Sequence, residues 1–165
     1  MINIDPTIRD LIERLQIQYC TALDNKNMQS WYNAFAEDEN ASYTCITKES
    51  VENDLSLAMM LDDCQARLKD RVTMVDEIWA GTFQDYRTRH FTQLVAADKN
   101  KDDLVDARTN FQVLYTPDET GITEVLTVGV YEDRIVVPKS GDAKFLTRKA
   151  VLDTNVLPRY LVYPI

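Results

Sequence analysis

The spacing of apolar side chains changes near Trp79, and this change restricts the fold more than any other feature of the sequence. Before Trp79, apolar residues recur at helical intervals of three and four positions. After Trp79 they alternate with polar residues, as in strands that bury one face. Helices followed by hairpin-connected strands predict an α+β fold, with N-terminal helices packed on a strongly curved, mainly antiparallel sheet.

The first predicted helix has a well-marked start. Asp5 is suited to cap the first free N–H groups, and Pro6 is suited to the first helical position. One face of this helix carries Ile8, Leu11, Ile12, Leu15, Tyr19 and Leu23. A polar break at residues 24–27 predicts that the helix ends near Leu23.

Three more elements are predicted before Trp79. The spacing of Met28, Trp31 and Phe35 indicates a short second helix, and residues 40–47 have the composition of a strand. Residues 50–72 are predicted to form one bent helix or two abutting helices, with Asp62 and Asp63 at the kink. The apolar positions behind this prediction are Leu57, Met60, Leu61, Cys64 and Leu68.

Four strands are predicted after Trp79. In residues 86–97, one face carries Tyr86, Thr88, His90, Thr92 and Leu94, and the other carries Arg87, Arg89, Phe91, Gln93 and Val95. A charged turn at residues 98–103 leads into a strand over residues 105–115. Turns at residues 117–121 and 138–142 delimit the last two strands, residues 122–137 and 144–156.

Composition restricts the class of protein. With 165 residues and 45% hydrophobic content, the chain is expected to form a single domain over residues 1–165. A net charge of -9 repels phosphate backbones, so no nucleic-acid partner is expected. There is no apolar stretch of roughly 20 residues and no leader-like start at residues 1–6, so we expect a cytoplasmic protein without a membrane partner. Cys20, Cys45 and Cys64 are expected to be reduced thiols.

The chain contains one histidine, His90, which limits its redox chemistry. A Rieske cluster requires two Cys and two His ligands, and a non-haem iron facial triad requires two His and a carboxylate. Neither centre can be assembled within this chain. No metal or cofactor site is therefore expected here, and any iron must be carried by a partner.

Five separated blocks resemble the small (β) subunit of aromatic-ring-hydroxylating oxygenases. The blocks are Leu23-Asp24 with Trp31, Phe35 and Asp38; Asp62-Asp63 with Asp70-Arg71-Val72; Tyr86-Arg87-Thr88-Arg89-His90; Gly129-Val130-Tyr131-Glu132-Asp133; and residues 152–165. The chain departs from the family at Thr47-Lys48-Glu49-Ser50, where Pro-Arg-Glu-Asn is common, and at Asp54, where glycine is common. Its ending is similar to that of systems acting on salicylate, anthranilate, halobenzoates or terephthalate.

This resemblance implies a cone-shaped roll like that of nuclear transport factor and scytalone dehydratase. It also implies a hetero-hexamer of three α and three β subunits that hydroxylates aromatic compounds during their catabolism. The α partner would carry the Rieske [2Fe-2S] cluster and the mononuclear iron, with electrons from NAD(P)H and with dioxygen as co-substrate. This chain would then be a non-catalytic scaffold that also contacts its own copies.

Charged and apolar residues are candidates for the subunit interfaces. Arg can form bidentate pairs with carboxylates, so the candidates include charges of both signs. They are Arg87, Arg89, Asp62, Asp63 and Asp70, with a solvated surface charge as the alternative for each. The apolar ending, including Tyr163 and Ile165, is expected to dock either on its own chain or on a neighbouring subunit.

A stand-alone enzyme or small-molecule-binding protein of the same fold is the alternative. His90 would be its acid or base, with Asp24 as the carboxylate partner, in an isomerase or dehydratase reaction. Tyr43 would donate a hydrogen bond to a developing oxyanion, as Tyr19 or Tyr86 also could. The bland interpretation is that His90 is a hydrogen-bonded strand residue and that the aromatic side chains form the core.

Overall fold

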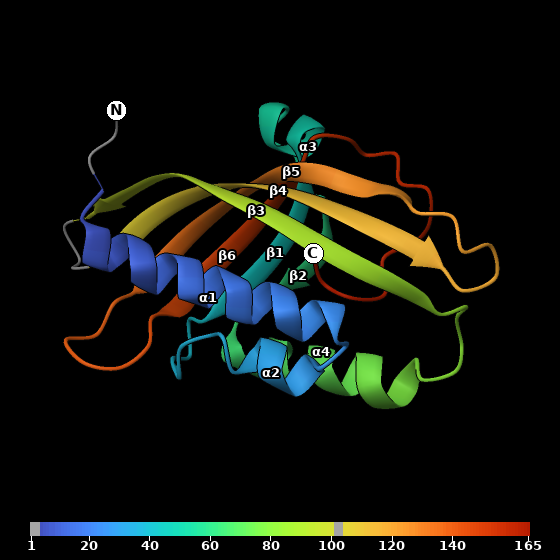
Figure 1. The fold of residues 1–165 in the computed structure, drawn as a ribbon, viewed down its shortest axis with the longest axis horizontal. Coiled ribbons are helices and arrows are strands. Elements are labelled where there is room, and N and C mark those ends of the chain that lie inside the picture. The colour runs from blue at the N-terminus through green and yellow to red at the C-terminus, as the bar shows by residue number, and fades with distance from the viewer. Residues whose placement is uncertain (1–3, 101–103) are drawn as a thin grey trace.

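The computed structural model describes residues 4–100 and 104–165, and its centre is a six-stranded sheet in the order β2-β1-β6-β5-β4-β3 (Figure 1). Residues 1–3 and the part of the predicted charged turn at residues 101–103 lie outside the described residues. The strands are β1 Ser42–Thr47, β2 Ala58–Asp62, β3 Tyr86–Lys99, β4 Val105–Pro117, β5 Glu124–Val136 and β6 Lys144–Leu152. Neighbouring strands are antiparallel except for the parallel pair β1 and β6, so the prediction of a mainly antiparallel sheet is confirmed.

Helix α1, Pro6–Asp24, begins and ends as predicted. The Asp5 carboxylate accepts hydrogen bonds from the backbone N–H groups of Thr7 at 2.8 Å and Ile8 at 3.3 Å, which satisfies two donors that the helix leaves free. Its apolar face is buried against the concave side of the sheet, and the helix runs beside β3 (Figure 1). One polar residue, Gln16, lies on that buried face.

The predicted short second helix is α2, Met28–Tyr32, and it ends before Phe35. Phe35 instead forms an isolated parallel bridge with Phe145 of β6. Trp31 is fully buried and its ring packs edge-on against Tyr43, with ring centres 5.8 Å apart. The aromatic residues of this segment therefore belong to the core.

The prediction of helix over residues 50–72 is confirmed for helix α4, Gln65–Thr73, but wrong for residues 58–62, which form a strand. The segment contains α3 Lys48–Glu52, β2 Ala58–Asp62 and α4 Gln65–Thr73, and α4 continues into the π-helical turn η1 Met74–Ile78. Met60 and Asp62 are buried in β2 while Met59 and Leu61 are exposed, so the true period is two. Five residues are too few to distinguish helical spacing from alternation. Pairing with β1 therefore decides that this segment forms a strand.

The two positions at which the sequence departs from the resembling family have local explanations. Thr47 accepts a hydrogen bond from the backbone N–H of Ser50 at 3.2 Å and so caps α3. Asp54 adopts a φ of 52°, in the left-handed region that favours glycine and that Asp tolerates better than most residues. The family's glycine at this position therefore fits the backbone of this turn.

Strand β4 alternates in burial along its length as predicted, and β3 does so in its first part, whereas Thr92, predicted to lie on the same face as Tyr86, is exposed. In β3, Tyr86 and Thr88 are buried while Arg87, Arg89 and Phe91 are exposed on the opposite face. The last strand is shorter than expected, since β6 ends at Leu152 and residues 153–165 continue without helix or strand. The sheet curves around α1, as Figure 1 shows, which confirms the predicted α+β roll.

The three cysteines are free, as expected, with Cys20 and Cys45 buried. Within the described residues, no helix is both long enough and apolar enough to cross a membrane.

Candidate functional site

The predicted acid–base pair does form in the folded chain. Asp24, at the end of α1, lies against the buried face of β3, and its Oδ1 is 2.7 Å from Nδ1 of His90. The same carboxylate accepts hydrogen bonds from the Thr88 hydroxyl at 2.9 Å and from the His90 backbone N–H at 3.2 Å. Burial raises the pKa of Asp24, but the hydrogen bonds and charge of His90 outweigh that effect and hold the pKa below its ordinary value.

The surroundings of His90 do not favour catalysis. Its side chain is only 2% exposed, and Nε2 is buried without a hydrogen-bond partner. A general acid or base must reach a substrate proton directly or through one water molecule. The pair formed by Asp24 and His90 instead joins the end of α1 to β3. This agrees with the structural alternative from the sequence, in which His90 is a hydrogen-bonded strand residue.

Tyr43, the third residue of the alternative site, is committed to another contact. Its hydroxyl accepts a hydrogen bond from the Ile165 backbone N–H at 2.8 Å and donates to the Ile165 main-chain oxygen at 3.2 Å. The Tyr19 hydroxyl donates to the same oxygen at 2.7 Å. Burial raises the pKa of both phenols, so both remain protonated donors. The predicted oxyanion donors therefore hold the end of the described chain.

A buried ion pair, which sequence reasoning missed, lies deeper in the roll. Arg148 of β6 and Asp133 of β5 both have side chains that are 0% exposed, and they form two hydrogen bonds of 2.9 and 2.8 Å. Gln16 of α1 completes the group, because its amide donates to Asp133 at 3.0 Å and accepts from Arg148 at 2.5 Å. Burial lowers the pKa of Arg148, but the charge and hydrogen bonds of Asp133 more than compensate and keep it charged.

Aromatic rings surround the buried guanidinium. The Arg148 carbon Cζ lies 4.1 Å from the ring centre of Tyr19 and 3.9 Å from those of Tyr131 and Phe145. A cation, its carboxylate and three rings thus fill the space between helix and sheet.

Gly129 makes this dense packing possible. A Cβ atom at this position would lie 2.1 Å from the Val151 carbonyl oxygen and 2.9 Å from Cζ of Phe111. Phe111 stacks on Tyr131 at a ring-centre distance of 4.2 Å. The block Gly129-Val130-Tyr131-Glu132-Asp133 therefore supplies a position without a side chain, the aromatic ring of Tyr131 and the buried carboxylate of Asp133. That block was the available sequence signal for the cluster, but its partner Arg148 was not recognised.

The structure separates the predicted interface charges into exposed and buried groups. Arg87 and Arg89 are exposed on the convex face of β3, and Asp63 and Asp70 are exposed on α4 or just before it. Asp62 is buried and forms two hydrogen bonds of 3.0 Å with Arg71. Burial raises the pKa of Asp62 despite this pairing. Asp62 therefore already has a partner within the chain.

The apolar ending docks on its own chain, which was one of the two predicted locations. Val162 and Ile165 are 3% and 2% exposed, and the Tyr163 ring packs edge-on against Phe83 and Tyr86. Tyr163 itself is half-buried and still presents part of its surface.

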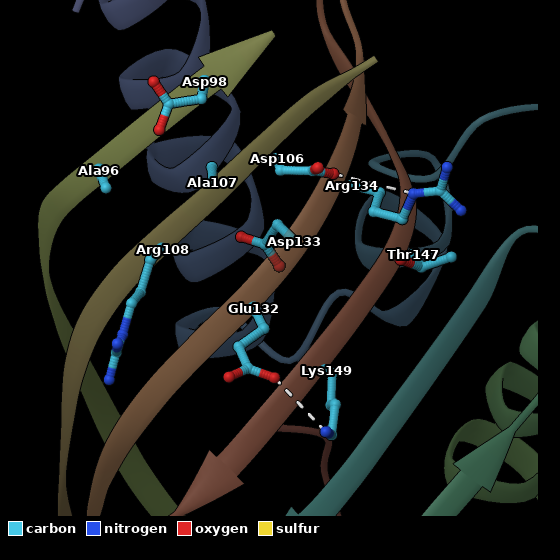
Figure 2. Close-up of a pocket in the computed structure, with 10 residues that line it drawn as sticks. All are labelled: Ala96, Asp98, Asp106, Ala107, Arg108, Glu132, Asp133, Arg134, Thr147 and Lys149. Carbon is cyan, nitrogen blue, oxygen red and sulfur yellow. Dashed lines mark ion pairs between the residues drawn. The ribbon is translucent and has the colours of Figure 1, made fainter. Parts of the chain in front are cut away.

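A hollow of about 440 Å³ on the sheet is lined mainly by charged side chains of β3 to β6 (Figure 2). Arg134 lies 3.8 Å from Asp106, and Lys149 lies 3.4 Å from Glu132. Because these pairs are about half exposed and side chains of both charges line it, the hollow is a solvated row of ion pairs rather than a pocket for an apolar substrate. Among residues 4–100 and 104–165, no group of three His, Cys, Asp or Glu could hold a metal ion.

The fold and its filled interior define a cone-shaped roll that lacks an open acid–base pocket at His90. Residues 19–159 match the family of ring-hydroxylating β subunits, and the chain belongs to that family. The small subunit of anthranilate 1,2-dioxygenase from Burkholderia cepacia is 27% identical over 154 residues, which are 93% of this chain and 92% of that subunit. The chain is thus a ring-hydroxylating β subunit, and the stand-alone enzyme is not favoured.

Solved structures show the same fold. A protein assigned as the β subunit of an aromatic-ring-hydroxylating dioxygenase from Novosphingobium aromaticivorans DSM 12444 superposes with a TM-score of 0.80 at 24% identity, covering 94% of this chain and 95% of that one. A protein assigned as a scytalone dehydratase from the same organism gives a TM-score of 0.66 at 17% identity, covering 93% and 91%. The expected likeness to the scytalone dehydratase roll is confirmed.

Proposed function

We propose that this chain is the structural subunit of a hetero-hexamer of three α and three β subunits, in which the α subunit carries the Rieske [2Fe-2S] cluster and the catalytic iron. The observation that carries this proposal is the single histidine, which is buried and bonded to Asp24. Because both iron centres require two histidines, the residues of this chain do not fit either one. Its contribution to ring hydroxylation is to hold the α subunits in place.

The surface supports contacts of two kinds. On the convex side of β3, Arg87 and Arg89 neighbour Phe91, whose exposure is 57%. At the other edge of the sheet, Met59 and Leu61 of β2 are 39% and 47% exposed. A closed ring of three copies needs two different self-contact surfaces, and the two sheet edges provide them. We assign Asp63, Asp70 and the exposed part of Tyr163 to contacts with the α subunit.

The substrate class proposed for the complex is an aromatic acid. The relative from Burkholderia cepacia is named for anthranilate, and the ending of this chain is similar to that of other aromatic-acid systems. The assembled complex is expected to turn over anthranilate or a related benzoate faster than naphthalene, which lacks a carboxylate. Preferential turnover of naphthalene would contradict this assignment.

The test of assembly is to tag the chain in its native host and to measure native mass, subunit composition and iron content of the purified material. A larger iron–sulfur polypeptide in equal stoichiometry is expected, with all the iron bound to that polypeptide. Recovery of this chain alone, or tightly bound stoichiometric iron in the separated chain, would overturn the proposal.

Substitution of His90 separates a structural subunit from an active one. In the assembled complex, His90→Ala is expected to leave turnover within about threefold of wild type, because His90 is enclosed between α1 and β3. A loss of several orders of magnitude in a correctly assembled complex would restore the acid–base role of the Asp24 and His90 pair.

A further inference from the structure

An aromatic hollow of about 290 Å³ lies beside the connection that leads into β3, and it shares no lining residue with the charged hollow of Figure 2. Its walls come from residues 79–83 and 160–162, which form neither helix nor strand. The lining residues are Trp79, Thr82, Phe83, Tyr160, Leu161 and Val162. Tyr160 is 63% exposed, and Ile78, next to Trp79 in the chain, is 58% exposed. An apolar hollow accompanied by exposed apolar residues is typical of a site that contacts another molecule.

The walls of this aromatic hollow are held by contacts with the rest of the fold. Thr82 closes the turn after Trp79, because its backbone N–H and its hydroxyl donate to the Trp79 carbonyl oxygen at 3.0 and 2.8 Å. The Phe83 ring packs edge-on against Tyr163 at a ring-centre distance of 6.0 Å. Tyr163 in turn packs against buried Tyr86 of β3 at 6.1 Å. The hollow is therefore anchored to the sheet through these rings.

Carboxylates lie close to the aromatic hollow. Asp76 and Glu77 precede Trp79 in η1, and both are exposed. Within residues 4–100 and 104–165, neither of them forms an ion pair. Burial raises the pKa of Tyr163 to about 12, and the negative charge of Asp76 adds to that effect, which places Asp76 near the ring that packs on Phe83. The surroundings of the hollow therefore favour a cationic partner.

The cations that this chain places nearby already have partners. Lys26 forms an ion pair with Asp85. Cζ of Arg159 lies 3.9 Å from the ring centre of Tyr86, and its Nη2 donates to the Gln84 carbonyl oxygen at 2.9 Å. These contacts leave the carboxylates of η1 for a cation from another molecule.

Arginine has the chemistry that this combination of rings and carboxylates requires. Its guanidinium is planar, so it stacks on aromatic faces, and its N–H groups pair with carboxylates. This chain already uses arginine in that way, since Arg148 lies 3.9 Å from the Tyr131 ring centre and pairs with Asp133. Lysine carries a point charge without a planar face, and an apolar side chain leaves the carboxylates without a counter-charge.

We propose that the aromatic hollow receives an arginine side chain of the α subunit, which stacks on the rings of Trp79 and Tyr160 and faces the carboxylate of Asp76. The hollow continues the surface assigned above to the α subunit, because Tyr163 of that surface packs against Phe83. This inference rests on the proposed function, since it names one contact within the assembly with α.

The choice of arginine is tested on the isolated full chain. The probe is Nα-acetylargininamide at low ionic strength, and its matched control is Nα-acetylnorleucinamide, which is apolar and has no guanidinium. The indole N–H resonance of Trp79, identified by its loss in Trp79→Phe, is followed by NMR. The arginine compound is expected to bind at least about threefold more tightly than its control, while the resonance of fully buried Trp31 stays in place. Equal binding of the two compounds, or no shift at Trp79, would overturn the proposal.

The contact with the α subunit is tested through Tyr160 in the purified complex. Tyr160→Leu keeps an apolar side chain but removes the ring, so association, measured by native mass on dilution, is expected to weaken at least about fivefold. Tyr160→Phe keeps the ring and should stay within about twofold of wild type. Because Tyr160 is exposed, both isolated variants should melt within about 2 °C of wild type. The control is Val156→Ala, at a 76% exposed position of the same segment outside the hollow, and it should also assemble within about twofold of wild type.

The outcomes separate this contact from the proposed function. If wild type assembles with an iron–sulfur polypeptide and Tyr160→Leu assembles equally well, the arginine contact is wrong and the proposed function stands. A loss in Val156→Ala as large as that in Tyr160→Leu would likewise count against the hollow as the site of contact. If no iron–sulfur polypeptide accompanies the wild-type chain, both proposals fail.

Discussion

At the scale of single residues, Arg148 is the side chain on which the interior depends most. Replacing it by Met would leave the Asp133 carboxylate buried without its cation, with Gln16 as its remaining hydrogen-bond donor among the described residues. Loss of one member of a buried ion pair typically costs about 3–5 kcal/mol. We therefore predict that Arg148→Met lowers the free energy of unfolding by about that amount, measured by urea denaturation.

A double variant distinguishes the lost charge from lost packing. In Arg148→Met with Asp133→Asn, no unpaired charge remains, so about half of the lost stability should return. As a control, Lys149→Met removes a partly exposed cation on the neighbouring position of β6 and should change stability by less than about 0.5 kcal/mol. A single variant as stable as wild type would show that the buried pair is dispensable.

Asp24 gives the protein an acid-sensitive contact. Its ordinary pKa is 3.8, and the folded state lowers that value. A lowered carboxylate pKa stabilises the fold fully above the unfolded value, and this contribution disappears as pH falls through the folded pKa. We predict that the stability difference between wild type and Asp24→Asn, measured by denaturation, is larger at pH 5 than at pH 2.5. An equal difference at both pH values would contradict the shift.

At the scale of elements, sequence patterns correctly predicted the helix and strands whose formation depends on residues that are close in the sequence. The Asp5 cap and the helical face after it predicted α1, and alternation predicted β3 and β4. Strand β2 was missed because its identity comes from pairing with β1, which its own five residues do not encode.

The candidate site shows the same division. The contact between Asp24 and His90 was proposed from residue chemistry, whereas its enclosure depends on how α1 packs against β3. From the sequence alone, Arg148 could not be distinguished from a solvent-facing polar residue of a strand. The bulge between Arg134 and Ile135 shifts the register in which β6 pairs with β5. The inward direction of Arg148 follows from that long-range pairing.

The C-terminal tail is the element with the most direct consequence for stability. Deleting residues 161–165 exposes the surfaces that Val162 and Ile165 cover and leaves two buried tyrosine hydroxyls unpaired. Burial of two such side chains contributes about 3–6 kcal/mol before entropy is subtracted. We predict a fall in melting temperature of at least about 8 °C and lower solubility. Unchanged melting and oligomer size would exclude a structural role for the tail.

At the scale of the whole molecule, packed side chains cover the concave side of the sheet, and the convex side is free to contact other subunits. Helix α1 covers the concave side of the sheet beside β3 in Figure 1, and the buried cluster around Arg148 lies between α1 and the sheet. The convex side carries charged and apolar residues of long strands, including Phe91. A subunit with a closed interior and an open outer face is suited to contact neighbours.

The arginines of β3 allow the role of the convex side in subunit contacts to be tested in the assembled complex. Arg87 has a side chain that is 74% exposed, and both Arg87 and Arg89 lie away from the core. We predict that replacing both by Glu shifts the native mass from that of the proposed hexamer to smaller species, while the isolated chain melts within about 2 °C of wild type. Charge reversal at a contact places like charges opposite each other and weakens association, whereas exposed charges contribute little to the stability of the folded chain. The matched control is Lys139→Glu, in the turn between β5 and β6, which should leave the native mass unchanged. A double variant that assembles as fully as wild type would remove the arginines from the interface and place the self-contacts elsewhere on the convex face.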